Sequence, residues 1–213
     1  CPDEFKETQV IALQVHGPGM FHSATKQIKS LADLKGMKVR GPTRQVTKML
    51  GAVGATPVGM PLPGIPDALS KGTIEACVIP WEVVPSVKVH ELTKFHSEFD
   101  NSGGALYTTT FVMAMNKAKY DSLPADLKKV IDANSGAETS AWLGKVQQSN
   151  DAVGRKAAVD RGNTIYQFTS AQRDEFIKLS AQIDDEWVAD MDKRGFKGAQ
   201  LLSTAKALIA KYK

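Results

Sequence analysis

The chain has 213 residues and a mass of 23.0 kDa, which corresponds to one or two domains. Hydrophobic residues make up 42% and charged residues 23%, as in ordinary globular proteins, so disordered, collagen-like and coiled-coil chains are poor fits. The 27 basic and 23 acidic residues give a net charge of +4 with both signs mixed along the chain, which argues against a nucleic-acid surface. No apolar run approaches the roughly 18 residues of a membrane span, so no direct membrane insertion is expected.

The chain begins at Cys1 without an initiator Met and without a basic-then-apolar leader. We therefore expect a processed, trimmed or cloned terminus. The two cysteines, Cys1 and Cys77, allow one intramolecular disulfide. Because Cys1 lies at a chain end and Cys77 in an apolar stretch, the sequence leaves open whether they pair and which redox compartment they occupy.

The first half of the chain alternates short apolar runs with helical patterns. The expected strands and extended segments are 10–15, 37–40, 56–60 and 76–79. The expected helices are 44–53 and 67–71, ended by Gly54 and Gly72, with a rigid proline-rich loop at 61–66. Strands separated by short helices imply right-handed βαβ crossovers and a largely parallel sheet, so the predicted fold class is α/β.

The second half contains longer helices. Strands are expected at 111–115 and 164–168, with a loop or short turn at 116–122. Pro124 is placed to open a helix of more than thirty residues, in which three glycines each cost about 1 kcal/mol relative to Ala and allow a kink. Thr169 is expected to cap a helix that ends near residue 193, and a last helix covers 200–211. Trp142 and Trp187 occupy apolar helix faces and are assigned to the core.

Enzyme motifs are absent from the sequence. His90 and His96 are six residues apart in a Lys- and Glu-rich segment, which does not match a helical metal pair, and both are expected at the surface. No nucleophile elbow, phosphate loop or dinucleotide fingerprint is present. We therefore predict no catalytic residue, no metal and no cofactor, although a triad assembled from distant positions would not be visible in sequence.

Arg40 is the most informative single residue. It ends an apolar strand just before Gly41 and Pro42, and ligands of open parallel sheets bind beyond the carboxyl ends of the strands. A guanidinium matches a carboxylate with two parallel hydrogen bonds. The alternative is a structural Arg paired with a nearby acid such as Asp33.

Trp81 is the second candidate, because it follows a strand and begins a loop. A Trp at that place offers a flat apolar wall and an N–H donor to a ligand. The alternative is a Trp that packs in the core or at a hinge, which is the more usual role of a single aromatic residue.

Four segments in the same order resemble the DctP-type solute receptors of tripartite ATP-independent periplasmic (TRAP) transporters. They are Ser30–Thr43 (SLADLKGMKVRGPT), Leu50–Pro57 (LGAVGATP), Ala68–Glu75 (ALSKGTIE) and Leu123–Lys128 (LPADLK). The resemblance extends from about Val15 to the C-terminus. Each segment alone is a weak signal, whereas four in register are specific.

The resemblance implies a non-enzymatic periplasmic receptor, made as a precursor with a signal peptide, whose two α/β lobes close on an organic acid. In the family, the Arg after the Lys-Gly-hydrophobic-Lys-hydrophobic pattern clamps the ligand carboxylate, and that residue here is Arg40. Closure that excludes water strengthens such an ion pair and favours the closed form. The implied partner is a TRAP permease in the membrane.

Two departures from the family pattern concern the ligand. Sugar-acid receptors of the family have a second Arg at the position of Met20 and an Asn at the position of Ile79. Apolar residues here would leave ligand hydroxyls unpaired, which is costly. The expected ligand is therefore a monocarboxylate with an apolar or aromatic body, such as an aryl 2-oxo acid. The expected binding residues are Arg40, Trp81, Met20, His22, Ile79, Thr109 (or Thr110) and Phe111.

Length is a third departure, since mature members of the family have roughly 300 residues, as expected of two domains. The resemblance implies a two-lobed fold with mixed, mostly parallel sheets, a long helix linking the lobes and an incomplete N-terminal lobe. Residues 1–17 and 111–157 would be remnants of that lobe, and 18–110 and 158–213 would form the second. The alternative function is an α/β enzyme or a sensor domain that acts on small organic acids.

Overall fold

The computed structural model describes residues 2–100 and 105–211. The strands are β1 (Thr8–Val15), β2 (Gly19–Ser23), β3 (Lys38–Gly41), β4 (Thr56–Gly59), β5 (Ala76–Pro80), β6 (Phe95–Phe99), β7 (Thr110–Asn116) and β8 (Thr164–Phe168). The α-helices are α1 (Leu31–Leu34), α2 (Arg44–Ala52), α3 (Ile65–Ser70), α4 (Val89–Leu92), α5 (Lys117–Asp121), α6 (Ala125–Ala133), α7 (Ala137–Asp160), α8 (Ser170–Lys193) and α9 (Gly198–Lys211). Three short 3-10 turns complete the order: η1 (Pro2–Phe5), η2 (Leu62–Gly64) and η3 (Trp81–Val83).

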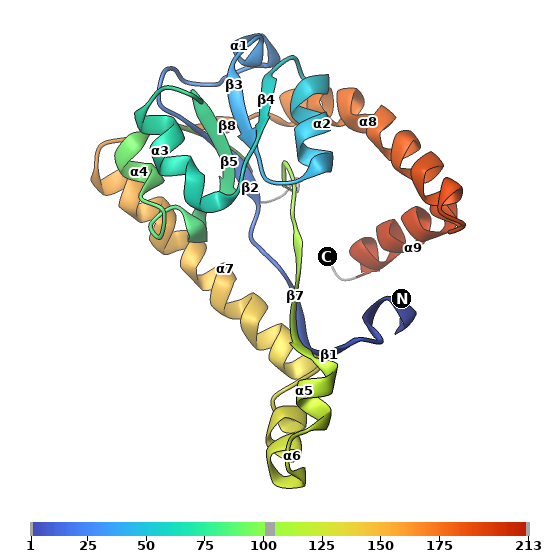
Figure 1. Ribbon diagram of the computed structural model, residues 1–213. Coiled ribbons are helices and arrows are strands. Elements are labelled where there is room, and N and C mark those ends of the chain that lie inside the picture. Colours follow the sequence, from blue (N-terminus) through green and yellow to red (C-terminus); the bar gives the residue numbers. More distant parts are fainter. Residues whose placement is uncertain (1, 101–104, 212–213) are drawn as a thin grey trace.

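Two sheets organise these elements, as Figure 1 shows. One has six strands in the order β4-β3-β5-β2-β6-β8, and the other is an antiparallel ribbon of β1 and β7. The ribbon stands away from the large sheet, and α7 runs from the ribbon to the large sheet and contacts β1, α4 and η3. The α/β class and the mixed, mostly parallel sheet are confirmed, because β3–β4, β3–β5 and β6–β8 pair parallel.

The antiparallel part of the large sheet comes from β2, which pairs with β5 on one side and β6 on the other. Neither β2 nor β6 was predicted. The five residues of β2 are all buried, so the strand has no alternation of apolar and polar positions to reveal it. In β6, His96, Ser97 and Glu98 are buried polar residues that a sequence pattern assigns to the surface.

The large sheet carries a core on each face. On one face, Phe21 and Val39 pack with residues of α1, α2 and α8. On the other, Met20 and Ile79 pack with residues of α3, α4 and α7. Because helices cover both faces of the sheet, side chains on both faces of a central strand are buried. The predicted strands are therefore continuous apolar runs.

Several boundaries follow from local chemistry. Thr169 caps α8 as predicted, because its hydroxyl accepts from the Gln172 N–H and the Gln172 side chain accepts in return. The predicted single helix from Pro124 is wrong: α6 ends at Ala133, and α7 begins after Gly136, which has a φ of 92°. A positive φ interrupts a right-handed helix, and only glycine adopts it readily.

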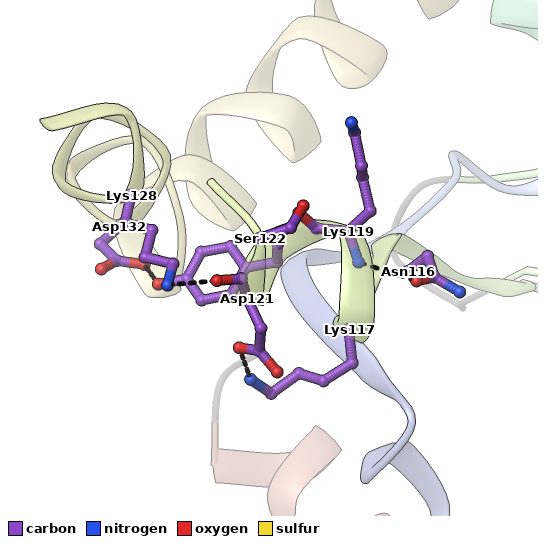
Figure 2. A network of polar contacts seen from close by, with 8 residues as sticks. Asn116, Lys117, Lys119, Asp121, Ser122, Lys128 and Asp132 are labelled. Atoms are coloured by element: carbon purple, nitrogen blue, oxygen red, sulfur yellow. Dashed lines mark hydrogen bonds and ion pairs between the residues drawn. The ribbon is translucent and has the colours of Figure 1, made fainter. Parts of the chain in front are cut away.

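The segment predicted as a loop after β7 forms the short helix α5, which a network of polar contacts joins to α6 (Figure 2). Asn116 caps α5 by accepting from the Lys119 N–H at 2.9 Å. Lys128 donates to the Asp121 carbonyl at 2.7 Å, and Lys117 pairs with Asp121. These contacts are exposed, so each adds little free energy, but together they fix the two helices at the far end of the ribbon.

The ribbon exposes apolar side chains. Phe111, Val112 and Met113 of β7 are 41–57% exposed, and Trp142 of α7 is 62% exposed. The assignment of Trp142 to the core is therefore wrong, because no other described element covers that face of the helix. Trp187 of α8 is half-buried beside α2 rather than fully in the core.

Cys77 is a buried free thiol in β5, and Cys1 lies outside the described residues. None of the described helices combines the length and apolar character needed to cross a membrane.

Candidate functional site

Arg40 lies in β3 near its carboxyl end, and its side chain is only 4% exposed. Its Nε donates to the Met60 carbonyl at 3.1 Å, and its Nη1 donates to the Val78 carbonyl at 3.3 Å. Burial lowers the pKa of the guanidinium without bringing it near neutrality. Within the described residues no carboxylate pairs with it. These two bonds use two of the five N–H groups of the guanidinium. A buried cation with three remaining donors is suited to bind an anion.

The structural alternative for Arg40 required an ion pair with Asp33. Asp33 instead completes the capping box of α1, where its Oδ2 accepts from the backbone N–H groups of Lys29 and Ser30, both at 3.0 Å. These bonds lower the pKa of Asp33 against the opposing effect of its partial burial, so the carboxylate is committed to the helix start. Asp33 therefore leaves the guanidinium of Arg40 without an acid.

The neighbours of Arg40 are neutral. Cys77 lies directly opposite on β5, and burial raises the pKa of its thiol to about 12 even beside the positive charge. The hydroxyl of Tyr107 donates to the same Val78 carbonyl at 3.1 Å, and burial raises the pKa of this phenol. Neither group supplies a negative charge at neutral pH, so an incoming anion would be the counterion.

In the register of the large sheet, Arg40 lies opposite Cys77, and Cys77 lies opposite His22 of β2. His22 in turn lies opposite His96 of β6. The two imidazoles touch, with 2.7 Å between their Nδ1 atoms. His22 Nε2 lies 3.1 Å from the Ile79 carbonyl, so it must carry the proton and donate, which leaves its Nδ1 as the acceptor. His96 then donates from Nδ1 and accepts the amide of Asn163 at its Nε2, 3.0 Å away.

These hydrogen bonds give both imidazoles a structural role. His22 and His96 are fully buried, and burial keeps their pKa low, to about 4 for His96. The expectation of a surface His96 is wrong, because β2 and β8 enclose it on both sides. His90 is half-buried. His22 was a predicted ligand contact; both of its ring nitrogens are engaged, and no nitrogen is left to reach a ligand.

Trp81 is 3% exposed and packs its ring against His22 and His96 at centroid distances of 4.9 and 5.0 Å. Its Nε1 donates to Glu98 at 2.9 Å, and the other oxygen of Glu98 accepts from Arg155 of α7, also at 2.9 Å. The indole N–H is therefore used inside the protein. One edge of Trp81 still borders a hollow of about 960 Å³.

That hollow lies between the large sheet and α7. Its lining includes Met20, Trp81, His16, Gln148 and Arg155. A smaller hollow of about 580 Å³ opens at the carboxyl ends of β3 and β4, where its lining includes Gly41 and Met60, next to Arg40. Arg40 itself is buried beside the smaller hollow rather than exposed in either.

The structure brings together Met20, Ile79, Trp81 and His22 in one cluster. Thr109 and Phe111 lie at the end of the ribbon, and both contact His16. The His16 N–H donates to the Thr109 carbonyl, with 3.4 Å between nitrogen and oxygen, and the ring centroids of His16 and Phe111 are 5.9 Å apart. Phe111 is 45% exposed. Thr109 and Phe111 thus border the site from the ribbon and do not belong to its apolar cluster.

A carboxyl pair lies where α7 meets η3. Burial, with Asp151 close by, raises the pKa of Glu82 to about 8, and the Glu82 N–H donates to Asp151 at 3.1 Å. A side chain at Gly17 would collide with Asp151, whose Oδ2 lies 2.3 Å from the ideal Cβ position. Sequence inspection missed this pair, the Glu98–Arg155 pair and Tyr107, because their partners are 29 to 69 residues away in the chain.

The comparisons with known proteins agree with this architecture. Residues 2–190 match the family model DctP, "Bacterial extracellular solute-binding protein, family 7". A TRAP solute-binding protein from Rhodoferax ferrireducens T118, in complex with copurified benzoate, is 68% identical with a TM-score of 0.95, over 98% of this chain and 65% of its own. A marine metagenome protein specific for aromatic acids, with bound 3-hydroxybenzoate, is 46% identical with a TM-score of 0.94, over 99% of this chain and 66% of its own.

Among curated proteins, the 2,3-diketo-L-gulonate-binding periplasmic protein YiaO of Escherichia coli K12 is 28% identical over 93% of this chain and 58% of its own length. The chain thus spans about 60% of the length of two of the curated relatives that it matches. The resemblance in the sequence is confirmed: the chain belongs to family 7 of the bacterial extracellular solute-binding proteins, the DctP family.

Proposed function

We propose that the protein is a receptor that binds a monocarboxylate with an apolar or aromatic body and delivers it to a TRAP permease. The observation that carries the proposal is the buried guanidinium of Arg40, which has free donors and no acidic partner among the described residues. A carboxylate can take two parallel hydrogen bonds from such a group and neutralise its charge.

Two further observations support an apolar ligand body. Met20 and Ile79 face each other across β2 and β5, and both are buried in an apolar cluster. The two similar structures bind benzoate and 3-hydroxybenzoate. A sugar acid would bury hydroxyl groups against these side chains without partners, at a cost of about 1–3 kcal/mol for each group.

The relatives also support the wider role. YiaO and the DctP protein of Rhodobacter capsulatus are periplasmic binding proteins by name, and we infer the same compartment for this chain. We further infer that the ribbon with α5, α6 and most of α7 (1–17 and 111–157) belongs to one lobe, and that 18–110 and 158–213 form the other. A ligand held between them would draw the lobes together, since it binds the closed form better.

Titration calorimetry tests the ligand class. Benzoate, cyclohexanecarboxylate and phenylpyruvate are expected to bind, while sialic acid binds much more weakly or not at all. Sialic acid that binds more tightly than the aromatic acids would overturn the proposed ligand class. The uncharged benzamide is the matched control, because it keeps the ring and removes the charge that Arg40 would recognise.

The alternative of an enzyme on the same acids has a separate test. Incubation of each binding acid with the protein, followed by proton NMR of the recovered acid, is expected to return it unchanged. Formation of a product in proportion to protein and time would replace the receptor with an enzyme.

A further inference from the structure

Tyr107 brings a second donor to the place where Arg40 ends. Its hydroxyl and Arg40 Nη1 both donate to the carbonyl of Val78, at 3.1 and 3.3 Å. A carbonyl oxygen has two lone pairs and can accept both bonds, so the two donors are neighbours around one atom. They come from different parts of the fold, Arg40 from β3 and Tyr107 from the segment that precedes β7.

The position of the Tyr107 ring is set by a glycine. An ideal Cβ at Gly19 would lie 2.1 Å from Cε1 of the ring, a distance that no side chain tolerates. The Gly19 N–H donates to the Tyr107 carbonyl at 3.0 Å, and the ring of His16 packs edge-on at 5.2 Å. Gly19 therefore has a role in holding this phenol.

The phenol is a suitable donor to an anion. Burial raises its pKa, so the hydroxyl keeps its proton throughout the physiological pH range. A hydrogen bond to a carboxylate is roughly twice as strong as one to a neutral carbonyl. Rotation of the hydroxyl about the Cζ–O bond redirects the proton without moving the ring that Gly19 and His16 hold.

Accepting the proposed function as a premise, we propose that Tyr107 is a ligand-binding residue: its hydroxyl turns from the Val78 carbonyl to donate to the carboxylate that Arg40 holds. Both carboxylate oxygens then face the guanidinium, and the phenol adds a third hydrogen bond to one of them. This pair of donors selects a group with two acceptor oxygens and no hydrogen. An amide in the same place would present an N–H group to donors, which explains why it should be rejected.

NMR of the protein labelled with 13C at tyrosine Cζ tests the contact, with cyclohexanecarboxylate as the ligand. The chain has four tyrosines, and the Tyr107→Phe variant assigns the resonance of interest. We expect the Tyr107 resonance to shift on saturation, and the Tyr166 resonance to stay, because Tyr166 bonds to Gln172 near the start of α8. A Tyr107 resonance unmoved by a ligand that binds would overturn the proposal.

Affinity gives a second readout. Tyr107→Phe keeps the ring and removes one bond to a charged group, so cyclohexanecarboxylate should bind about ten- to a hundredfold more weakly. Tyr166→Phe is the matched control, with an affinity within about twofold of the wild type. If wild type and Tyr107→Phe bind equally well, the role of Tyr107 is wrong and the proposed function stands. If the wild-type chain binds none of the tested carboxylates, the proposed function fails, and the role of Tyr107 with it.

Discussion

Two arginines lie on the same face of the large sheet and differ in burial and in their partners, since Arg40 is buried whereas the side chain of Arg155 is 46% exposed and bonds to the buried Glu98. Arg155 reaches from α7 to Glu98, and that carboxylate also accepts from Trp81, so the charges cancel within the protein. Arg40 has two carbonyl acceptors and no carboxylate within the described residues. The Arg155–Glu98 pair joins α7 to the sheet, whereas Arg40 has no acidic partner among the described residues and, under the proposed function, receives its counterion from the ligand.

The comparison separates stability from binding. Removing one member of a buried ion pair strands the other charge and destabilises the fold. Removing a buried cation that has no acidic partner abolishes no ion pair, so we expect the fold to lose little and, under the proposed function, the ligand to lose its anchor.

Replacement of Arg40 should have the largest effect. Arg40→Gln is expected to weaken benzoate binding at least about a hundredfold, which corresponds to roughly 3 kcal/mol, because the bidentate charged contact is lost. The melting temperature should change by only a few degrees, since the amide can still donate to one of the two carbonyls. Calorimetry and a thermal melt measure both quantities, and unchanged affinity would contradict the account.

A smaller effect, confined to stability, is expected at Gly154. An ideal Cβ there would lie 1.8 Å from the Trp81 carbonyl oxygen, so Gly154→Ala should push α7 from η3 and cost about 2 kcal/mol or more. Gly144→Ala on the same helix is the matched control, because no atom lies within 4 Å of its Cβ position. It should stabilise the helix by up to about 1 kcal/mol. Equal unfolding midpoints in urea for the two variants would refute the close packing of α7 on η3.

Arg155→Gln should have the next largest effect on stability. Glu98 would keep Trp81 but lose its countercharge, and because the Arg155 side chain is 46% exposed, water offsets part of the loss. We expect a destabilisation of about 1–2 kcal/mol, seen as a lower urea midpoint, with benzoate affinity within a few-fold of the wild type. A variant that folds as well as the wild type and fails to bind would reverse the roles of the two arginines.

The smallest effect is a pH dependence at Glu82. Its pKa in the folded protein, about 8, lies above its usual value of 4.5, so folding favours the protonated form and stability falls as pH rises between these values. His22 and His96, whose pKa is lowered, oppose this below pH 6.5, where the unfolded chain binds their protons first. The pKa of His16, which also lies near Asp151, is lowered too, so His16 likewise makes stability rise with pH.

Comparison of the wild type with Glu82→Gln between pH 6.5 and 8 isolates Glu82, because the histidines contribute equally to both proteins. Over this range the melting temperature of the wild type should fall relative to that of Glu82→Gln, which is neutral at both pH values, so the variant should have the more positive slope of melting temperature against pH. Glu75→Gln serves as the matched control, since that half-buried glutamate precedes β5 and accepts from the Lys38 N–H instead of facing Asp151, and it should leave the slope unchanged. An identical slope in wild type and Glu82→Gln would exclude Glu82 as its source.

Sequence reasoning identified Arg40 because the residue sits in a contiguous motif whose strand and following turn are local features. The helix that begins after Thr169 was predicted for the same reason, since its cap is formed by residues four apart or fewer. Tyr107 gave no such signal, because it precedes β7 and meets Arg40 only through the carbonyl of Val78 on β5.

Burial that depends on distant strands was also beyond prediction. His96 follows a Lys- and Glu-rich segment, and its burial arises from pairing with β2 and β8, which come from opposite ends of the chain. Trp142 shows the opposite error, since an apolar helix face predicted a partner element that the described residues do not supply. Local patterns therefore predicted most elements, while contacts between strands decided which polar groups were buried.

The most direct test of the division between the two arginines is a crystal structure of the protein with bound benzoate. The account predicts that both carboxylate oxygens lie within about 3 Å of donors that include the terminal nitrogens of Arg40, while Arg155 stays on Glu98. A benzoate whose carboxylate is bound at Arg155 or elsewhere, with Arg40 still bonded only to the carbonyls of Met60 and Val78, would contradict it.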